Sequence, residues 1–240
     1  EENHMPDVTL GSVTGGSGEL TGYLAEPSGP GPWPGVVSIH EAWGLDPVMR
    51  RAADRLASMG YLTLALNLYS DGGPRCVAST IRALASNTGK PFADIDAAQS
   101  WLRERPDCTG KVGVIGFCMG GAFALLTAPR GFDAAAVNYG PLPRHRDEAL
   151  AGACPIVASY GRRDLANLGA ARKLTETFER LGIEHDVKEY PRAGHSFLND
   201  TMTGPRVLRP LLWLTGFKPD AITAEDAWGR IDAFFAAHLG

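Results

Sequence analysis

The 240-residue sequence has no long apolar run, and none of its segments approaches the roughly 20 residues of a membrane-spanning helix. Its amino-terminal stretch also lacks the charged and then apolar order of a secretion signal. We therefore expect no membrane insertion and a cytoplasmic location. Because His4-Met5 is typical of a cloning site, we interpret residues 1–7 as a tag remnant and disordered amino terminus, and residues 8–240 as a single domain.

Concentrated positive charge is also missing. The 23 Lys and Arg residues are scattered and are outnumbered by 27 Asp and Glu residues, which gives a formal net charge of −4. Proteins that bind nucleic acids or anionic membranes normally carry a basic patch. We therefore expect neither of these partners and predict a small-molecule substrate, and the chain is compatible with either a monomer or a homodimer.

Cysteine is scarce, with four widely spaced residues: Cys76, Cys108, Cys118 and Cys154. Without a C-x-x-C pair they indicate neither a zinc site nor a disulfide framework, and we expect free thiols. The pair His40-Glu41 could begin a zinc-binding helix, but glycine occupies position 44, where a second histidine is required. We therefore expect no metal and no other cofactor.

Apolar runs of strand length alternate with amphipathic segments of helix length along the chain. Strands are predicted at 8–13, 19–25, 36–40, 61–68, 111–115, 132–139, 155–160 and 184–190. Helices are predicted at 46–59, 75–86, 92–105, 168–181 and 224–239, with another after residue 121. This alternation predicts an α/β fold, in which helices cover both faces of a mostly parallel sheet. Functional residues are then expected at the carboxyl ends of the strands, where segments 141–146 and 205–217 could form a lid or a subunit contact.

The stretch Gly116-Phe-Cys-Met-Gly-Gly121 joins a predicted strand to a predicted helix. This is the setting of the G-x-S-x-G nucleophile elbow, with Cys118 in place of serine. Glycine is needed at 116 and 120 because the sharp turn brings backbone segments close together. The free N–H groups at the start of the helix favour a thiolate, so Cys118 is a candidate nucleophile; the alternative is a buried structural cysteine.

Two further residues follow predicted strands in the chain order nucleophile, acid, histidine. Asp164 follows Tyr160-Gly-Arg-Arg163, and His195 lies in Ala193-Gly-His-Ser-Phe197. His195 would accept the proton of Cys118, and Asp164 would orient the imidazole. The alternatives are a helix cap or surface ion pair for Asp164 and a backbone-bonded loop histidine for His195.

The same geometry predicts an oxyanion hole formed by two backbone N–H groups. One would belong to Met119, and the other to Ala42 in the loop after the strand that ends at His40. Glu41 lies directly beside the second donor.

The motifs His-Glu-Ala-Trp-Gly, Gly-Phe-Cys-Met-Gly-Gly, Gly-Arg-Arg-Asp and Gly-His-Ser-Phe together resemble those of the dienelactone hydrolase family. The resemblance covers residues 8–239 and implies the α/β-hydrolase fold, a Cys-His-Asp triad at Cys118, His195 and Asp164, and a carboxymethylenebutenolidase-like hydrolysis of enol-lactones. It also implies that Glu41 helps to convert the thiol into a thiolate when substrate binds. A carboxylate beside a thiol would disfavour the thiolate in the resting enzyme, although Glu41 could instead simply pair with an arginine.

The sequence departs from the family where a basic residue is expected a few positions after the histidine, because Leu198, Asn199 and Asp200 follow Phe197. The resemblance also implies a substrate-binding arginine in the helix that follows Tyr69, for which Arg82 and Arg75 are the candidates. The other substrate-binding candidates are Trp43, Tyr69, Tyr139 and Phe197. Each of the aromatic residues could equally be part of the core.

The leading interpretation is a hydrolase for small carboxylic esters or lactones that works through a covalent acyl-enzyme. One alternative keeps the triad but acts on a thioester or an amide. Another is a non-catalytic hydrolase-fold protein that binds a ligand or senses oxidants through Cys118.

Overall fold

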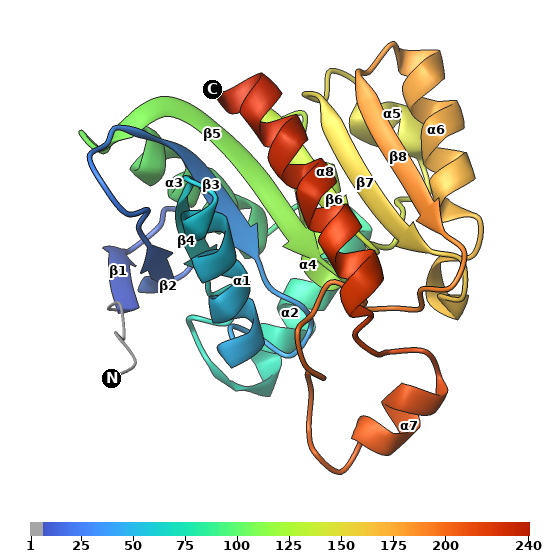
Figure 1. Ribbon diagram of the computed structural model, residues 1–240. Helices are drawn as coiled ribbons and strands as arrows, with labels where there is room; N and C mark the ends of the chain where they lie inside the picture. Colours follow the sequence, from blue (N-terminus) through green and yellow to red (C-terminus); the bar gives the residue numbers. More distant parts are fainter. Residues whose placement is uncertain (1–6) are drawn as a thin grey trace.

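The computed structural model describes residues 7–240, which form one eight-stranded sheet with the strand order β1-β2-β4-β3-β5-β6-β7-β8 (Figure 1). Strand β2 is antiparallel to β1 and β4, and the neighbours from β4 to β8 are parallel. The strands are β1 Asp7–Gly11, β2 Leu20–Ala25, β3 Trp33–Ile39, β4 Leu62–Leu66, β5 Cys108–Phe117, β6 Ala134–Asn138, β7 Ile156–Gly161 and β8 His185–Tyr190.

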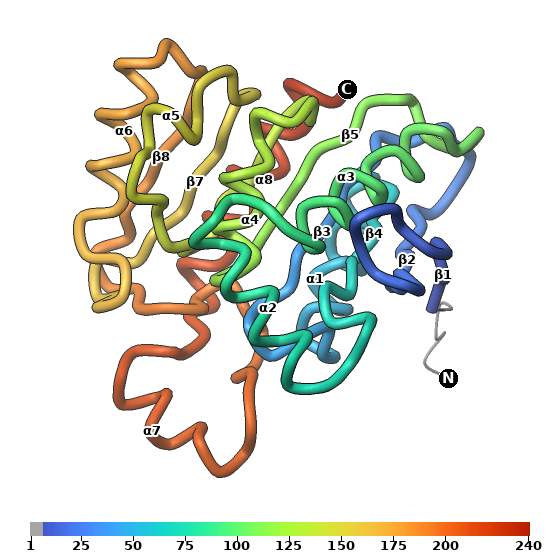
Figure 2. Tube along the Cα trace, turned by 180° about the vertical axis from the view of Figure 1, so that it is seen from behind, coloured from blue at the N-terminus to red at the C-terminus, as the bar shows by residue number. Residues whose placement is uncertain are grey.

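Helices cover both faces of this sheet. The α-helices of residues 7–240 are α1 Pro47–Ser58, α2 Gly73–Ser86, α3 Lys90–Arg103, α4 Met119–Thr127, α5 Arg146–Leu150, α6 Ala170–Leu181, α7 Arg209–Leu214 and α8 Ala221–Leu239. Helices α1 and α8 lie on the face seen in Figure 1, and α2 to α6 lie on the opposite face, seen in Figure 2. The architecture predicted from the alternation of strands and helices is confirmed.

The core extends along both faces because the central strands are buried on each side. All residues of β4, β6 and β7 are buried, as expected for parallel strands that read as continuous apolar runs. One large cluster contains Phe123 of α4 and Phe178 of α6, and another contains Trp228 and Phe235 of α8. This packing fixes the strand ends from which the site is built.

Helix α8 begins earlier than the sequence analysis predicts. Its first residue is Ala221 rather than Ala224, because Asp220 is the N-cap and accepts a hydrogen bond from the Thr223 N–H at 3.3 Å. Asp226, in the second turn of the helix, forms an ion pair with Lys188 on β8. Strand β1 similarly begins at Asp7, within the range expected to be disordered; residues 1–6 lie outside the described residues.

The segment 205–217 contains α7 and extends past the carboxyl edge of the sheet (Figures 1 and 2). All six residues of α7 are at least partly exposed. After α7, Phe217 forms an isolated parallel bridge with His195, and the Lys218 N–H donates to the carbonyl of His195 at 3.1 Å. Within residues 7–240, no helix combines the length and apolar character needed to cross a membrane.

Candidate active site

Cys118 lies between β5 and α4, in the turn predicted for it. Its backbone has φ 53° and ψ −116°, a conformation that is strained for a residue with a side chain, and the residue is half-buried. A Cβ atom at Gly116 would clash with the carbonyl of Gly120, and one at Gly120 would clash with the carbonyl of Ile39. The two glycines therefore let α4 start immediately after the strand, with Cys118 at its N-cap.

Asp164 and His195 are brought together from the ends of β7 and β8, and both are almost fully buried. His195 Nδ1–H donates to Asp164 Oδ2 at 2.7 Å, and the side-chain amide of Asn167 donates to the same oxygen at 2.7 Å. Asp164 also caps a short 3₁₀ helix through Oδ1, which accepts from the Ala166 N–H at 3.0 Å. Burial opposes ionisation of Asp164, but the hydrogen bonds from His195 and Asn167 outweigh it and lower the pKa of the carboxyl.

His195 presents its second ring nitrogen away from Asp164. Among residues 7–240, Nε2 has no hydrogen bond of acceptable geometry, including none to Cys118 Sγ, and the atom is buried. The thiol is nevertheless close enough to affect the ring: burial lowers the pKa of His195, but Asp164 and Cys118 outweigh burial and raise it above the ordinary value. The rings of Tyr139 and Phe217 hold the imidazole with centroid distances of 5.0 and 4.3 Å.

The backbone N–H groups of Ala42 and Met119 follow the carboxyl ends of β3 and β5, which are paired in the sheet. Within the described part of the chain, neither N–H donates a hydrogen bond. Tyr69 links the two residues, since its hydroxyl donates to the Ala42 carbonyl at 3.0 Å and lies 3.5 Å from Met119 Sδ. The arrangement can therefore present two free donors to an anion.

Glu41 is buried, with 2% of its surface exposed, and it is surrounded by neutral donors. Its Oε1 accepts from Ser196 Oγ at 2.8 Å and Asn199 Nδ2 at 3.1 Å, and its Oε2 accepts from Thr203 Oγ1 at 2.8 Å. In the span 7–240 no arginine or lysine forms an ion pair with it, so the alternative of a simple arginine pair is wrong. The carboxylate ties the loop after β3 to the loop that carries His195.

The sequence model described as "Dienelactone hydrolase family" matches residues 20–239 of this chain. The chain belongs to the dienelactone hydrolase family. It is 29% identical to a carboxymethylenebutenolidase of Pseudomonas putida over 206 residues, which cover 80% of this chain and 87% of that protein. It is 28% identical to the protein usf of Aquifex pyrophilus, with 92% and 94% covered.

Solved structures share the fold of this dienelactone hydrolase family member. A dienelactone hydrolase from Anabaena variabilis superposes with a TM-score of 0.64 at 22% identity and covers 98% of each chain. A dienelactone hydrolase-like promiscuous phosphotriesterase from metagenomic libraries superposes with a TM-score of 0.77 at 24% identity, covering 99% of this chain and 100% of the other. These structures confirm the α/β-hydrolase fold, and the family match with its named relatives confirms the assignment as a hydrolase.

Two of the predicted substrate-binding residues are packed in the core of the structure. Tyr139 and Phe197 are both 0% exposed, and their rings contact each other with a centroid distance of 5.4 Å. Phe197 also packs on Tyr190, and Tyr139 packs on Phe117. Both rings belong to the core beneath the site. The sequence does not reveal this, because a side chain that follows a buried strand can point into the core or toward the site.

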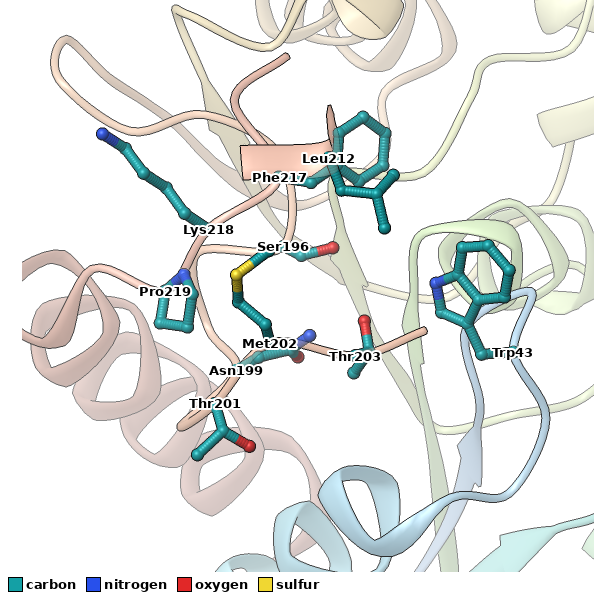
Figure 3. Close-up of a pocket in the computed structure, with 10 residues that line it drawn as sticks. All are labelled: Trp43, Ser196, Asn199, Thr201, Met202, Thr203, Leu212, Phe217, Lys218 and Pro219. Atoms are coloured by element: carbon teal, nitrogen blue, oxygen red, sulfur yellow. The ribbon is translucent and has the colours of Figure 1, made fainter. Parts of the chain in front are cut away.

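The other predicted substrate-binding residues have different surroundings. Trp43 is 40% exposed and lines a small pocket, whereas Arg82 is exposed on α2. Tyr69 is half-buried and directs its hydroxyl to the Ala42 carbonyl in the loop after β3. Figure 3 shows the pocket, with Trp43 at one side and Lys218 and Pro219 at the other.

The pocket includes three residues that the sequence analysis does not identify. Ser196, Asn199 and Thr203 line it and also hold Glu41 (Figure 3). Asn167, which binds Asp164, is missed as well. Neutral polar residues in loops carry no spacing signal, so only Ser196, within the Gly-His-Ser-Phe motif, could have been found. Within residues 7–240, no group of three or more His, Cys, Asp or Glu side chains is arranged to hold a metal ion.

Proposed function

We propose that this enzyme hydrolyses small carboxylic esters or lactones through an acyl group carried on Cys118. His195 Nε2 takes the thiol proton, and the sulfur attacks the carbonyl carbon. The oxyanion is stabilised by the N–H groups of Met119 and Ala42. When the carbon–oxygen bond breaks, His195 returns its proton to the leaving oxygen, which in a lactone remains attached to the acyl group.

Deacylation uses the same groups in reverse. Water gives a proton to His195 as its oxygen attacks the thioester, and the thiolate leaves and takes that proton back. Asp164 remains ionised and stabilises the imidazolium in both halves. The observation that supports this proposal best is the buried Asp164–His195 hydrogen bond at 2.7 Å, with a free Nε2 near a half-exposed thiol.

The partly exposed aromatic rings of Trp43 and Tyr69, on the loops that follow β3 and β4, support a substrate with an apolar or aromatic acyl group. Trp43 also lines a small pocket with Leu212 and Phe217, and Lys218 is the one cation among the residues that line it (Figure 3). Rates on a matched oxygen ester, thioester and amide would distinguish the proposed activity from the thioesterase and amidase alternatives. An oxidant sensor would react with peroxide at Cys118 and turn over none of the three.

The nucleophile is tested by Cys118→Ala with nitrophenyl acetate as substrate. We expect kcat to fall by a factor on the order of 10⁴ or more, as for loss of the nucleophile in other triads. Cys154→Ala, a half-buried thiol outside the site, is the matched control and should keep full activity. Full turnover by Cys118→Ala would refute the proposal.

Glu41 is proposed to restrain the resting thiol. Glu41→Gln removes a negative charge that opposes thiolate formation, so we expect a changed pH dependence of Cys118 alkylation by iodoacetamide. Glu104→Gln, at an exposed carboxylate after α3, should leave the profile unchanged. An unaltered profile in Glu41→Gln would remove this role.

A further inference from the structure

His40 follows β3 and is buried, with 1% of its surface exposed. Its Nε2 lies 3.1 Å from the backbone nitrogen of Leu68, two residues after the end of the neighbouring strand β4. A backbone N–H can only donate, so Nε2 must accept and the ring proton must be on Nδ1. Nδ1–H therefore donates to the carbonyl of Glu41, at 2.6 Å.

The Glu41 carbonyl belongs to the same peptide group as the Ala42 N–H. In a planar trans peptide these two groups point in opposite directions, and among the described residues only Gly31–Pro32 is cis. The carbonyl accepts a second hydrogen bond, from the Gly44 N–H at 3.1 Å. With the carbonyl fixed by two donors, the Ala42 N–H must point away from the His40 ring.

Tyr69 fixes the following peptide group. Its hydroxyl donates to the Ala42 carbonyl at 3.0 Å, and its ring lies 4.8 Å from the ring of His40. The peptide planes on both sides of Ala42 are thus held by side chains, while the Ala42 N–H, in the first of these planes, has no partner within residues 7–240. A backbone donor that is held but unused is what oxyanion stabilisation requires.

We propose that His40 and Tyr69 are positioning residues that aim the Ala42 N–H at the oxyanion formed during acyl transfer. The inference rests on the proposed function and assigns to His40 a role that its motif does not reveal. Neither side chain needs to touch the substrate. His40 binds the Glu41 carbonyl, on the side of the peptide group opposite to the Ala42 N–H. Tyr69 binds the Ala42 carbonyl and contacts the side chain of Met119, whose N–H is the second donor.

The protonation state of His40 suits this role. Burial lowers its pKa to about 4, so the imidazole is neutral throughout the neutral pH range. The ring can then donate from Nδ1 and accept at Nε2 without a change of tautomer.

The test compares His40→Asn, which keeps an amide donor near the position of Nδ1, with His40→Leu, which keeps none. We expect kcat for nitrophenyl acetate to fall about 10- to 100-fold in His40→Leu, less than for complete loss of a donor. His40→Asn should recover part of this loss. KM should stay within about twofold of the wild-type value. The rate of Cys118 alkylation by iodoacetamide should do so as well, because alkylation forms no oxyanion.

A second readout measures the oxyanion hole directly. A thionoester develops its charge on sulfur, a poor hydrogen-bond acceptor, so the kcat ratio of ester to matched thionoester reports on the N–H donors. This ratio should shrink in His40→Leu and in Tyr69→Phe. If His40→Leu does not fold, Tyr69→Phe alone provides the test. A merely structural role would lower both rates alike.

His185→Leu is the matched control, since His185 Nδ1 lies 2.8 Å from the Ile183 carbonyl at the start of β8, away from the carboxyl end of the sheet. Its ratio of kcat for the ester to kcat for the thionoester should be unchanged.

The inference would be overturned if kcat and this ratio were unchanged in both His40→Leu and Tyr69→Phe, or if alkylation and turnover were lost equally. If Cys118→Ala is active, the proposed function itself fails; if it is inactive while the His40 and Tyr69 variants behave as wild type, only this inference fails.

Discussion

His40 is a buried imidazole whose charge state differs between the folded and unfolded chain. Its pKa is about 4 when folded and near 6.5 when exposed, so between these pH values only the unfolded chain binds the proton. Stability is therefore lost as the pH falls through this window, by up to about 3 kcal/mol from this residue.

We predict that His40→Asn loses less stability than the wild type on acidification from neutral pH to about pH 5. Urea unfolding at the two pH values measures the difference. Equal losses in the two proteins would show that His40 does not titrate as its burial requires.

At the level of residues, the sequence predicts the groups that belong to motifs. Asp164 and His195 were expected to meet, and they do. Asn167 and Thr203 were missed because a neutral side chain in a loop becomes significant only when folding places it against a buried carboxylate. The sequence does not reveal that Phe197 is packed in the core, because an aromatic residue after a strand gives the same pattern whether it faces the core or the substrate.

At the level of elements, the β5–α4 turn depends on the absence of side chains at two positions. In Gly120→Ala, the new methyl group would overlap the Ile39 carbonyl, and neighbouring backbone cannot easily move away. Gly229 is also helical, but it is exposed on α8 and has open space around its Cα.

We predict that the two substitutions have opposite signs. Gly120→Ala should lower the free energy of unfolding by at least about 2 kcal/mol, whereas Gly229→Ala should raise it by roughly 0.5–1 kcal/mol through better helix propensity. Chemical denaturation of both variants checks this. A Gly120→Ala protein as stable as the wild type would show that the elbow tolerates a side chain.

The elements themselves were largely predictable because burial on both faces gives parallel strands an uninterrupted apolar pattern. The boundaries of the helices were less predictable. Asp220 and Thr223 are both favoured cap residues three positions apart, and only the observed hydrogen bond at Asp220 selects the earlier start of α8.

At the level of the whole molecule, topology brings the site together. Strands β5, β7 and β8 are parallel, so the residues after them meet at one edge of the sheet although Cys118 and His195 are far apart in sequence. The order of the functional residues along the chain predicted this convergence. The path of segment 205–217 was not predictable, because exposed apolar residues on α7 carry no information about the direction in which the segment leaves the sheet.

The central claim is that the acyl group of the substrate is carried on the sulfur of Cys118. Mass spectrometry of the enzyme, quenched in acid during turnover of nitrophenyl acetate, tests it most directly. We predict one added acetyl group, located on the peptide that contains Cys118, absent from Cys118→Ala and lost on further incubation at neutral pH. Turnover without an adduct at Cys118, or with an adduct at another residue that is formed and lost at the rate of turnover, would contradict the claim.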